Sequence, residues 1–585
     1  NYTPNDLIDD VKKKGVQSSK YCSCRRPSSS SSFRKTILFM ATFSRGKLTM
    51  VRHISFVVFG ASGDLARKKT FPALYRLFDH GTFPPNKRAR IVGFARSSFS
   101  RDEFHQRVRE SIGADADEKT VGKLLDVCDY VKAEEGYGSE QGYKQLNQLL
   151  EVAEKCSPHA DKSHGHRDEV RSKALRIYYM ALPPNQYELV ATMLRKYAWP
   201  SSDTHTTLLL LEKPYGSSLT TACVLSRKLN SIGLSDQRDV RIVDHYLGKD
   251  ILRQILALRF SSASLPLATM FHRDVVSHVT LDFKESFGAE GRGGYFDEFG
   301  IVRDVMENHL MHLLAFSAME KPSDMTPKAL VDARLDLLRC VRSASTDDVM
   351  LGQYVANPSD PNKKGYQEDE AVKDDSKTPT YACCRLFIDN ARWRGVPFIL
   401  QAGKGLDEDR VELTLHFQPL PDPLLPPDEA LASSLKLDHG RLVLQDKPDL
   451  RLELHTAAKH TGAANVKDLV PTTLVLRFRE LYGQQIGENG NEAPPYEESP
   501  YEFLFREAME GDDTWFVGKD EAEEQWRVWE KYLEVEGKKV PLNYVYGSSG
   551  PTEVEELVER WINEALSQRK EELIYTSDSI MRNEL

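Results

Sequence analysis

Residues 241–250 read RIVDHYLGKD and gather an acid, a histidine, a tyrosine and a lysine directly after an apolar, strand-like run. The pattern predicts a helix that begins near Asp244 and places His245 and Lys249, at i and i+4, on one face. A helix start with a histidine and a lysine beside it is suited to binding a phosphate dianion. An ordinary solvated helix start would use the same residue types, so the rest of the chain must decide between the two interpretations.

A second group of reactive side chains lies in GRGGYFDEFGIVRDVMENHLMHLLAF, residues 291–316. A helix is predicted from about residue 301 by an apolar stripe made of Val302, Val305, Met306, Leu310 and Leu313. His309 lies on that stripe, where a histidine is more often a core residue than a catalyst. Asp304 is about 140° round an α-helix from His309 and is therefore badly placed to orient it. His309 and His312 have a spacing that suits a metal, but the sequence offers no third ligand, and we expect no metal site.

The segment FVVFGASGDLARKK, residues 56–69, runs from an apolar strand directly into a predicted helix. Gly60 permits a tight turn, Gly63 allows the backbone to approach a phosphate, and Ala66 lets the helix pack close to the strand. Backbone N–H groups at the start of that helix can bind the pyrophosphate of a dinucleotide. Because the spacing is GxxGxxA rather than GxGxxG, a turn without a ligand remains an alternative. The residues predicted to bind the cofactor here are Gly60, Ala61, Ser62, Gly63, Asp64, Leu65, Ala66 and Arg67.

The next apolar strand continues as IVGFARSS over residues 91–98 and ends in Arg96 and two serines. A site for NAD would usually have Asp or Glu there to bind the ribose hydroxyl. An arginine can instead pair with a 2′-phosphate through two hydrogen bonds. We therefore expect NADP to be the cofactor, although an exposed arginine after a strand is also common.

These elements must be positioned by a chain of 585 residues, which exceeds the size of one ordinary domain. The hydrophobic share of 40% and charged share of 28% are typical of globular proteins, and the net charge of −9 argues against nucleic acid as a partner. The eight cysteines include no CxxC pair, so neither a disulfide framework nor a zinc site is expected. We expect the protein to occupy a reducing compartment. No apolar run is long enough to span a membrane.

Short apolar runs alternate with helix-like stretches in the first half of the chain, at 54–60, 89–95, 174–183 and 206–214. Unbroken apolar strands separated by helices predict a parallel sheet, and we expect an α/β, Rossmann-like coenzyme domain over residues 51–243. Segments that alternate polar and apolar residues follow, such as VELTLHFQP. They predict an α+β domain over 244–585 with a large, mainly antiparallel sheet and an exposed loop at 356–379. Residues 1–50 are basic and serine-rich and are expected to form a disordered leader.

Six segments together resemble one family, glucose-6-phosphate dehydrogenase. In order they are FGASGDLA, EKPYG, DHYLGK, FKESFGAEGRGGYFDEFGIVRDVMENHL, LGQY and VPFILQAGKGL. The resemblance runs almost continuously from residue 51 to about 475, and DHYLGK is highly specific. It implies hydride transfer from C1 of glucose 6-phosphate to NADP, giving 6-phosphogluconolactone and NADPH in the first step of the oxidative pentose phosphate pathway. The basic leader, which contains Cys22 and Cys24, resembles the extended forms of trypanosomatid parasites.

The resemblance also implies roles for individual residues. His309 matches the general base that removes the proton of the C1 hydroxyl, and Asp244 matches the carboxylate that orients it and stabilises its imidazolium form. Tyr187 and Lys213 match positions on the cofactor side, near the nicotinamide. The positions that match substrate-binding residues are Lys213, His245, Tyr246, Lys249, Glu285, Asp304 and Lys404. A homodimer or homotetramer is implied as well.

Some positions depart from the family pattern. Arg479 stands roughly where a substrate-binding glutamine is expected, and Asp409 stands where an arginine is expected, with Arg410 one place later. The stretch after LVLR is short for a segment that should supply several strands, and the C-terminal tail lacks the usual aromatic residues. We therefore expect one NADP per chain, bound in the coenzyme domain.

Two hypotheses about activity follow from this pattern. The first is an active NADP-dependent dehydrogenase, and the second is a non-catalytic family member that binds a ligand or a partner. The enzyme is favoured because the residues needed for chemistry are all present. A cytoplasmic location is expected, and a pool in a peroxisome-like organelle is left open.

Overall fold

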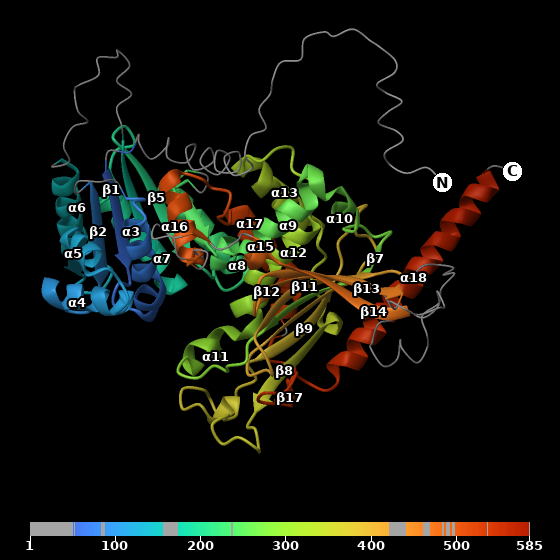
Figure 1. Ribbon diagram of the computed structural model, residues 1–585. Coiled ribbons are helices and arrows are strands. Elements are labelled where there is room, and N and C mark those ends of the chain that lie inside the picture. The colour runs from blue at the N-terminus through green and yellow to red at the C-terminus, as the bar shows by residue number, and fades with distance from the viewer. Residues whose placement is uncertain are drawn as a thin grey trace, which may run out of the picture. The chain divides into compact units, whose positions relative to one another are not determined.

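The computed structural model describes residues 51, 53–83, 88–155, 173–235, 238–419, 440–459, 469–481, 485–486, 492–493, 498–534 and 536–583 (Figure 1). The leader predicted over residues 1–50, with Cys22 and Cys24, lies outside them. Two large sheets organise the described part, one formed before residue 244 and one after it.

The first sheet has six parallel strands in the order β3-β2-β1-β4-β5-β6. The central strands β1 and β4 are buried along their whole length, as expected for a sheet covered on both faces. The strands are His53–Phe59 (β1), Ala89–Ala95 (β2), Cys128–Lys132 (β3), Ala174–Met180 (β4), His205–Glu212 (β5) and Val240–Val243 (β6). This strand order is that of a Rossmann fold, which confirms the predicted α/β coenzyme domain.

Helices cover the two faces of this sheet. Those connecting β1, β2 and β3 pack on one another, and those that follow β3 form a second group. They are Phe71–Asp79 (α3), Arg101–Ile112 (α4), Glu118–Asp126 (α5), Glu140–Lys155 (α6), Tyr187–Tyr197 (α7) and Leu219–Ser231 (α8).

The second sheet has nine strands in the order β14-β13-β12-β11-β7-β10-β9-β8-β17. The β7–β10 and β8–β17 pairs are parallel and the others antiparallel, which confirms the predicted mainly antiparallel sheet. The strands are Val276–Lys284 (β7), Val349–Val355 (β8), Tyr381–Leu386 (β9), Phe398–Gly403 (β10), Arg410–Phe417 (β11), Arg441–Lys447 (β12), Arg451–Lys459 (β13), Leu469–Arg477 (β14) and Leu542–Val545 (β17). A separate two-stranded sheet pairs Gln485–Ile486 (β15) with Glu492–Ala493 (β16). Eight of the nine strands of this sheet, as described here, lie before residue 478, and only β17 follows it.

The helices of the second part are Asp250–Phe260 (α9), Leu265–Thr269 (α10), Gly293–Ile301 (α11), Met311–Ala318 (α12), Pro327–Cys340 (α13), Phe478–Leu481 (α15), Pro500–Glu510 (α16), Lys519–Leu533 (α17) and Val554–Asn583 (α18). The nine-residue π-helical segment η5, Val302–Leu310, joins α11 to α12 and packs against β10 and β7. In a π-helix each N–H bonds the carbonyl five residues earlier. The angle between Asp304 and His309 around the helix axis is therefore much smaller than the 140° expected for an α-helix, and the two residues lie closer to the same side.

The prediction of a helix that begins near Asp244 and carries both His245 and Lys249 is wrong. Asp244 instead caps a short 3-10 helix, His245–Gly248 (η3), by accepting a 2.8 Å hydrogen bond from the Tyr246 N–H. Lys249 is extended, with φ −83° and ψ 141°, and α9 begins only after it. His245 and Lys249 therefore do not share a helical face, because the cap allows a single tight turn before the chain straightens.

The C-terminal region returns to the first sheet. Helix α16 packs against α3 and η3, and its Phe505 ring lies 5.0 Å from those of both Phe56 and Tyr179. Val517 forms a β-bridge with Ile242 on the edge strand β6. Residues far along the chain thus complete the edge of the coenzyme sheet.

The loop over residues 356–379, predicted to be exposed, is packed against α11. Tyr366 is buried, and its hydroxyl donates a 2.9 Å hydrogen bond to Asp297. The Thr378 hydroxyl donates to the Asp297 carbonyl at the same distance. An aromatic residue within this polar stretch therefore attaches it to the fold.

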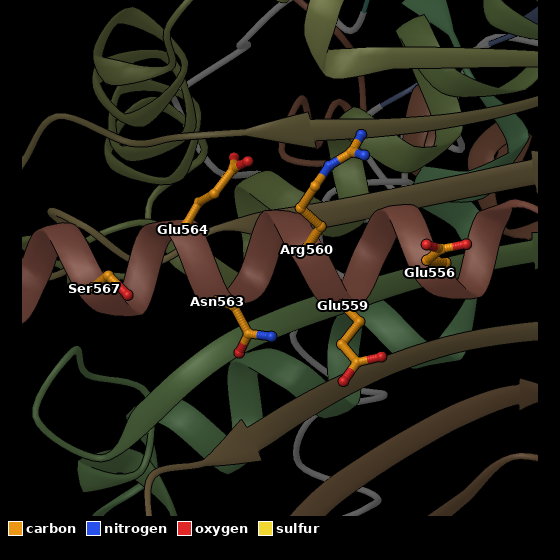
Figure 2. Close-up of a pocket in the computed structure, with 6 residues that line it drawn as sticks. All are labelled: Glu556, Glu559, Arg560, Asn563, Glu564 and Ser567. Atoms are coloured by element: carbon orange, nitrogen blue, oxygen red, sulfur yellow. The ribbon is translucent and has the colours of Figure 1, made fainter.

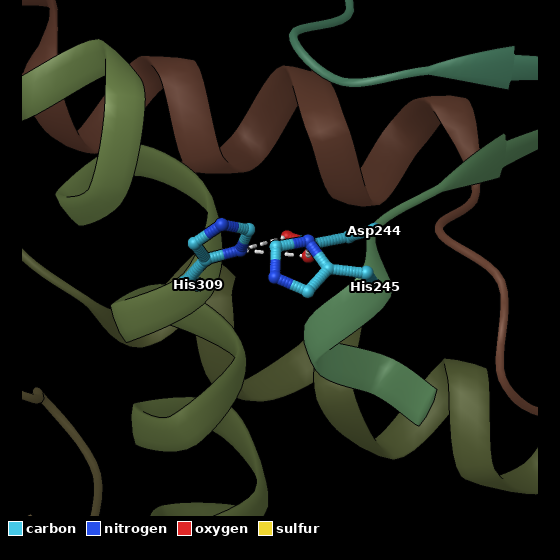
Figure 3. A group of neighbouring side chains, drawn as sticks. All are labelled: Asp244, His245 and His309. Carbon is cyan, nitrogen blue, oxygen red and sulfur yellow. Dashed lines mark hydrogen bonds and ion pairs between the residues drawn. The ribbon is translucent and has the colours of Figure 1, made fainter. Parts of the chain in front are cut away.

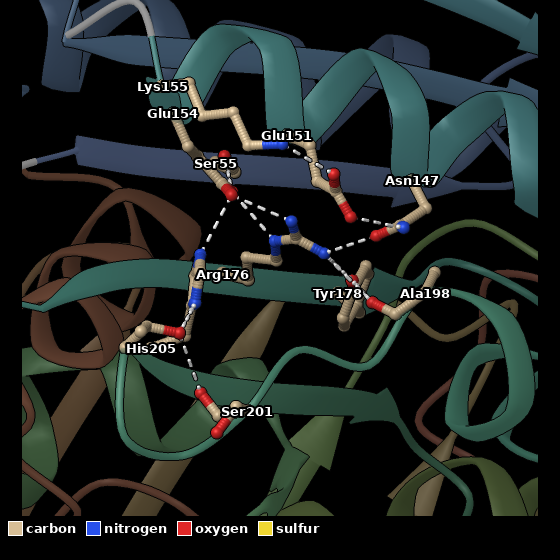
Figure 4. Close-up of polar contacts among 11 residues, drawn as sticks. Ser55, Asn147, Glu151, Glu154, Lys155, Arg176, Tyr178, Ala198, Ser201 and His205 are labelled. Atoms are coloured by element: carbon tan, nitrogen blue, oxygen red, sulfur yellow. Dashed lines mark hydrogen bonds and ion pairs between the residues drawn. The ribbon is translucent and has the colours of Figure 1, made fainter.

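A buried polar cluster fixes α6 to the first sheet (Figure 4). Arg176 of β4 forms two hydrogen bonds with the Glu154 carboxylate, at 2.7 and 2.8 Å. Ser55 of β1 and His205 of β5 contact the same carboxylate at 2.9 and 2.8 Å. Three strands are therefore joined to one helix through Glu154.

Among the described residues, no helix is both long enough and apolar enough to cross a membrane. The long helix α18 carries an open hollow along one side (Figure 2). It is lined by Glu556, Glu559, Arg560, Asn563, Glu564 and Ser567, none of which is a predicted site residue.

Candidate active site

Asp244 and His309 form the centre of the site (Figure 3). Asp244 follows β6, and His309 lies in η5. His309 Nδ1 is 2.7 Å from Asp244 Oδ1 and 2.9 Å from Oδ2. Since a carboxylate only accepts, Nδ1 donates the ring proton and Nε2 keeps the free lone pair. An imidazole held in this way can accept a proton at Nε2.

Burial and nearby charges set the protonation of this pair. Burial alone would raise the pKa of Asp244, but its contacts with His309 and His312 hold that pKa well below the usual value. Burial lowers the pKa of His309 below 6.5, while Asp244 opposes this effect and Lys213 adds to it. At neutral pH the pair is therefore a carboxylate and a neutral imidazole.

Aromatic rings enclose His309. The Tyr246 ring stacks on it with centroids 4.3 Å apart, and the His245 ring meets it edge-on at 4.6 Å. Tyr501 of α16 lies parallel to the other side of His245, at 6.0 Å. The three side chains place the 245–246 segment directly against the imidazole.

A network of lysines and carboxylates lies beside this centre. Lys213, after β5, donates to the Asp304 carbonyl at 2.8 Å and lies 3.1 Å from its carboxylate. Lys404, after β10, lies 2.5 Å from Glu285 and 3.1 Å from Asp304. Burial alone would raise the pKa of Asp304, but the two lysines lower it strongly. Asp304 is thus a half-buried anion between two cations, and its partner is not His309.

Lys249 makes a contact that the sequence did not predict. Its Nζ lies 3.2 Å from Asp446 Oδ2, a carboxylate at the end of β12, and 5.9 Å from the Tyr246 ring centre. The second sheet therefore contributes an acid to the segment that was singled out first.

The glycine-containing turn lies where β1 ends. Gly60 has φ 77°, and a Cβ there would come within 2.3 Å of the Ala181 carbonyl oxygen. Only glycine fits such a position. Gly63, Asp64 and Arg67 are exposed, and Ala66 is buried against the sheet. The turn thus presents its backbone at the carboxyl edge of the parallel sheet, where dinucleotides bind in this fold.

The other predicted cofactor residues differ in their exposure. Arg96 is exposed after β2, and its guanidinium lies 5.8 Å from the Tyr137 ring centre. Tyr187 is fully buried and donates a 2.7 Å hydrogen bond to the Glu212 carbonyl, directly before Lys213. Tyr187 therefore supports the end of β5, and its hydroxyl is not presented to a ligand.

Three residues near the centre were not predicted as parts of the site: Tyr501, Asp446 and His312. Asp446 comes from a segment whose sequence carries no visible motif, and Tyr501 from PYEFLFREAME, where the family resemblance resumes but implied no role for this tyrosine. His312 was considered as a metal ligand and rejected, but its Nε2 lies 3.1 Å from Asp244 Oδ2.

Asp244, His245 and His309 each place one possible ligand atom within 4.8 Å of the others. This spacing also suits a metal ion, but the carboxylate and His309 already satisfy each other. The expectation of a site without metal stays a prediction.

The fold and the site together define a class of protein. A parallel coenzyme sheet with a glycine turn after its first strand, joined to a second domain that supplies a histidine beside a carboxylate, is the architecture of a pyridine-nucleotide oxidoreductase.

Comparisons identify the family. Residues 57–254 match the NAD binding domain of glucose-6-phosphate dehydrogenase, and residues 256–564 match its C-terminal domain. The chain belongs to the glucose-6-phosphate dehydrogenase family. The second match continues through the region after residue 475, where the sequence resemblance had weakened.

Individual relatives agree with this assignment. The chain is 34% identical to a glucose-6-phosphate 1-dehydrogenase of Cyberlindnera jadinii, over 86% of this chain and 93% of that one. It is also 34% identical to the Arabidopsis thaliana protein named glucose-6-phosphate 1-dehydrogenase 6, cytoplasmic, over 87% and 91%. A solved glucose-6-phosphate dehydrogenase in complex with glucose 6-phosphate superposes with a TM-score of 0.74 at 31% identity, covering 87% of this chain and 97% of that one.

Proposed function

We propose that this protein is a glucose-6-phosphate 1-dehydrogenase that transfers hydride from C1 of glucose 6-phosphate to NADP, giving 6-phosphogluconolactone and NADPH. The family match and the relatives support the activity. The observation that carries the mechanism is the contact of 2.7 Å between His309 Nδ1 and the Asp244 carboxylate.

In the proposed reaction His309 Nε2 takes the proton of the C1 hydroxyl as the C1–H bond breaks. The imidazole then becomes positively charged, and the Asp244 carboxylate beside Nδ1 stabilises that charge. General-base help of this kind is worth about 10²- to 10⁴-fold in rate. Since the pKa of His309 is lowered, the ring is ready to accept a proton at neutral pH.

We assign the substrate phosphate to His245, Tyr246 and Lys249. Among the described residues, the buried Tyr246 hydroxyl has no hydrogen-bond partner, so it is available to an incoming oxygen. Burial holds the pKa of His245 well below its usual value, so this ring contributes a neutral donor and Lys249 supplies the charge. Lys213, Glu285, Asp304 and Lys404 are assigned to the sugar hydroxyls, because their network lies directly beside the His309 centre.

The residues around the glycine turn fit a dinucleotide. The turn from Gly60 to Arg67, which is exposed at Gly63, Asp64 and Arg67, would hold its phosphates. The arginine at the end of β2 would bind a 2′-phosphate, which supports NADP over NAD. When bound, the nicotinamide accepts the hydride. Tyr187, which supports the end of β5, and Lys213, which directly follows that strand, would lie on the nicotinamide side of the site.

Organisation and location complete the proposal. We place the coenzyme domain at 51–243 and the substrate and oligomerisation domain at 244–585, preceded by the leader at 1–50. The assembly is a homodimer or homotetramer, and the location is cytoplasmic, as the name of the Arabidopsis relative suggests. Sedimentation analysis and cell fractionation test these two statements.

The activity is tested by following NADPH absorbance after purified protein is mixed with NADP and glucose 6-phosphate. Turnover is expected with NADP and glucose 6-phosphate. It should be much weaker when unphosphorylated glucose replaces glucose 6-phosphate. Folded protein that binds both ligands without forming NADPH would favour the non-catalytic alternative.

A further inference from the structure

His312 touches the same carboxylate that orients His309. It lies on α12, is fully buried, and its Nε2 is 3.1 Å from Asp244 Oδ2. The approach is oblique rather than aligned as a hydrogen bond. Asp244 is therefore shared by two imidazoles, His309 near the end of η5 and His312 near the start of α12. A change at either ring alters the charge distribution of the Asp244 carboxylate.

The other side of the ring fixes its tautomer. Gln525 of α17 lies with Nε2 3.3 Å from His312 Nδ1. An amide nitrogen only donates, so Nδ1 accepts and the ring proton is on Nε2, the atom that faces Asp244. His312 thus carries its ring proton on the nitrogen that lies 3.1 Å from Asp244 Oδ2, so a polar N–H adjoins the carboxylate without forming an aligned hydrogen bond.

A buried ion pair between Glu521 and Arg334 lies on the Nδ1 side of the His312 ring. Glu521 Oε1 lies 3.8 Å from His312 Nδ1, and the same carboxylate makes hydrogen bonds of 2.9 and 3.0 Å with Arg334 of α13. Arg334 also donates to the Thr514 and Phe516 carbonyls. Helices α12, α13 and α17 are thereby joined behind Asp244.

The charged and titratable groups that face this ring come from several elements. Asp244 and Glu521 lie beside the ring, and Arg334 pairs with Glu521. His309 and Glu307 of η5 act on Asp244, Lys213 acts on His309, and Arg259 of α9 binds the carbonyl end of α12.

We infer that His312 is a positioning residue for the reaction: its Nε2–H holds Asp244 in place and draws part of the negative charge away from His309. The inference rests on the proposed function, in which His309 is the base. Without the second donor, the full carboxylate charge would act on His309 and favour its protonated form. The imidazole would then lose its proton-accepting form at a higher pH, and the carboxylate would be less firmly held.

The test compares His312→Leu, which removes the polar N–H beside Asp244, with His312→Gln, which can keep a polar N–H next to that carboxylate. Phe316→Leu is the matched control, because it perturbs the same buried helix one turn away without touching Asp244. The pH profile of kcat is measured for each protein, and the His309 ring is titrated by NMR on histidine-labelled samples.

In His312→Leu the acid limb of kcat and the His309 titration should both move up by about 0.5 to 1 pH unit, and the plateau of kcat should fall several-fold. His312→Gln should retain the wild-type midpoint, and Phe316→Leu should lower stability alone. Unmoved midpoints in His312→Leu would overturn the inference, as would an equal shift in the control Phe316→Leu or in His312→Gln.

The NMR titration needs no turnover, so it separates this inference from the proposed function. A shifted His309 titration in protein that forms no NADPH would keep the inference and reject the function. Turnover with an unmoved titration would do the opposite.

Discussion

Gly248 lies directly against Pro500: a Cβ on Gly248 would come within 2.6 Å of the Pro500 carbonyl oxygen and 2.9 Å of its Cα. Two residues far apart in the chain therefore meet at backbone distance, because one of them has no side chain. The contact seats the start of α16 on η3, and it sets the position of His245 through Tyr501, the next residue of that helix.

Gly248→Ala should displace α16 from η3, because backbone cannot move aside as a flexible side chain can. The expected result is a rise of about tenfold or more in KM for glucose 6-phosphate, with a smaller change for NADP. Steady-state kinetics check it. Gly122→Ala is the control, since a Cβ there meets nothing within 4 Å in helix α5, and its kinetics should match wild type.

His309→Asn should lower kcat by about 10²-fold or more, because the base is lost, while substrate binding measured by calorimetry changes little. The control His278→Asn removes a histidine from β7, outside the site, and should keep turnover. Near-wild-type kcat in His309→Asn would remove this residue from the mechanism.

Arg96→Ala should weaken NADP binding far more than NAD binding, by on the order of 1.5–3 kcal/mol, because a charge-assisted pair with the 2′-phosphate is lost. Calorimetry should find one NADP site per chain in the wild type. An equal loss for both cofactors would show that Arg96 is structural, and a second site that survives the substitution would contradict the expected stoichiometry.

Glu154→Gln should destabilise the protein by about 3 kcal/mol at neutral pH, because Arg176 keeps its buried charge without a charged partner. Burial alone would raise the pKa of Glu154, but His205 and Arg176 lower it to about 2, from 4.5. The carboxylate therefore stabilises the fold above about pH 4.5, and this stabilisation is lost as the pH falls toward 2. In thermal melts, the difference in melting temperature between Glu154→Gln and wild type should shrink as the pH falls from about 4.5 toward 2. Glu151→Gln, which removes the charge of the exposed pair with Lys155 and can keep the hydrogen bond from Asn147, should have little effect at any pH.

Glu307→Gln should protect the protein at alkaline pH. Burial raises the pKa of Glu307 to about 8, and the nearby Asp244 adds to the shift. Stability from the protonated acid is complete below its ordinary pKa of 4.5 and is lost as the pH rises through about 8. The variant should therefore melt at least about 2 °C above wild type at pH 9, and the gap should narrow toward pH 5. A gap that is constant with pH would show that Glu307 does not titrate in this range.

The sequence allowed much of the coenzyme sheet to be predicted, because its buried strands are unbroken apolar runs. The short strand Cys128–Lys132 was not predicted, since its alternation of polar residues reflects an edge position that only the sheet defines. The second sheet could be predicted as a type but not in its strand order, because pairing between distant segments leaves no local pattern.

The site shows the same division. Asp244 and His309 were joined through family resemblance, since no local pattern connects positions in different elements. The prediction of a helix after Asp244 failed because the Asp244 carboxylate caps a short 3-10 turn, and the spacing of the residues that follow does not reveal this cap. His312 was judged by its spacing to His309, whereas its neighbour in space is Asp244, which reaches it from β6.

The bridge between Val517 and the edge strand β6 has a consequence for biosynthesis. A ribosome delivers the coenzyme sheet first, with the outer edge of β6 open, and supplies its cover only after more than 270 further residues, since the ion pair of Arg241 with Asp513 spans 272 positions. An uncovered strand edge invites pairing with other chains. During synthesis, and in any product that terminates early, this edge is therefore open to pairing with another chain.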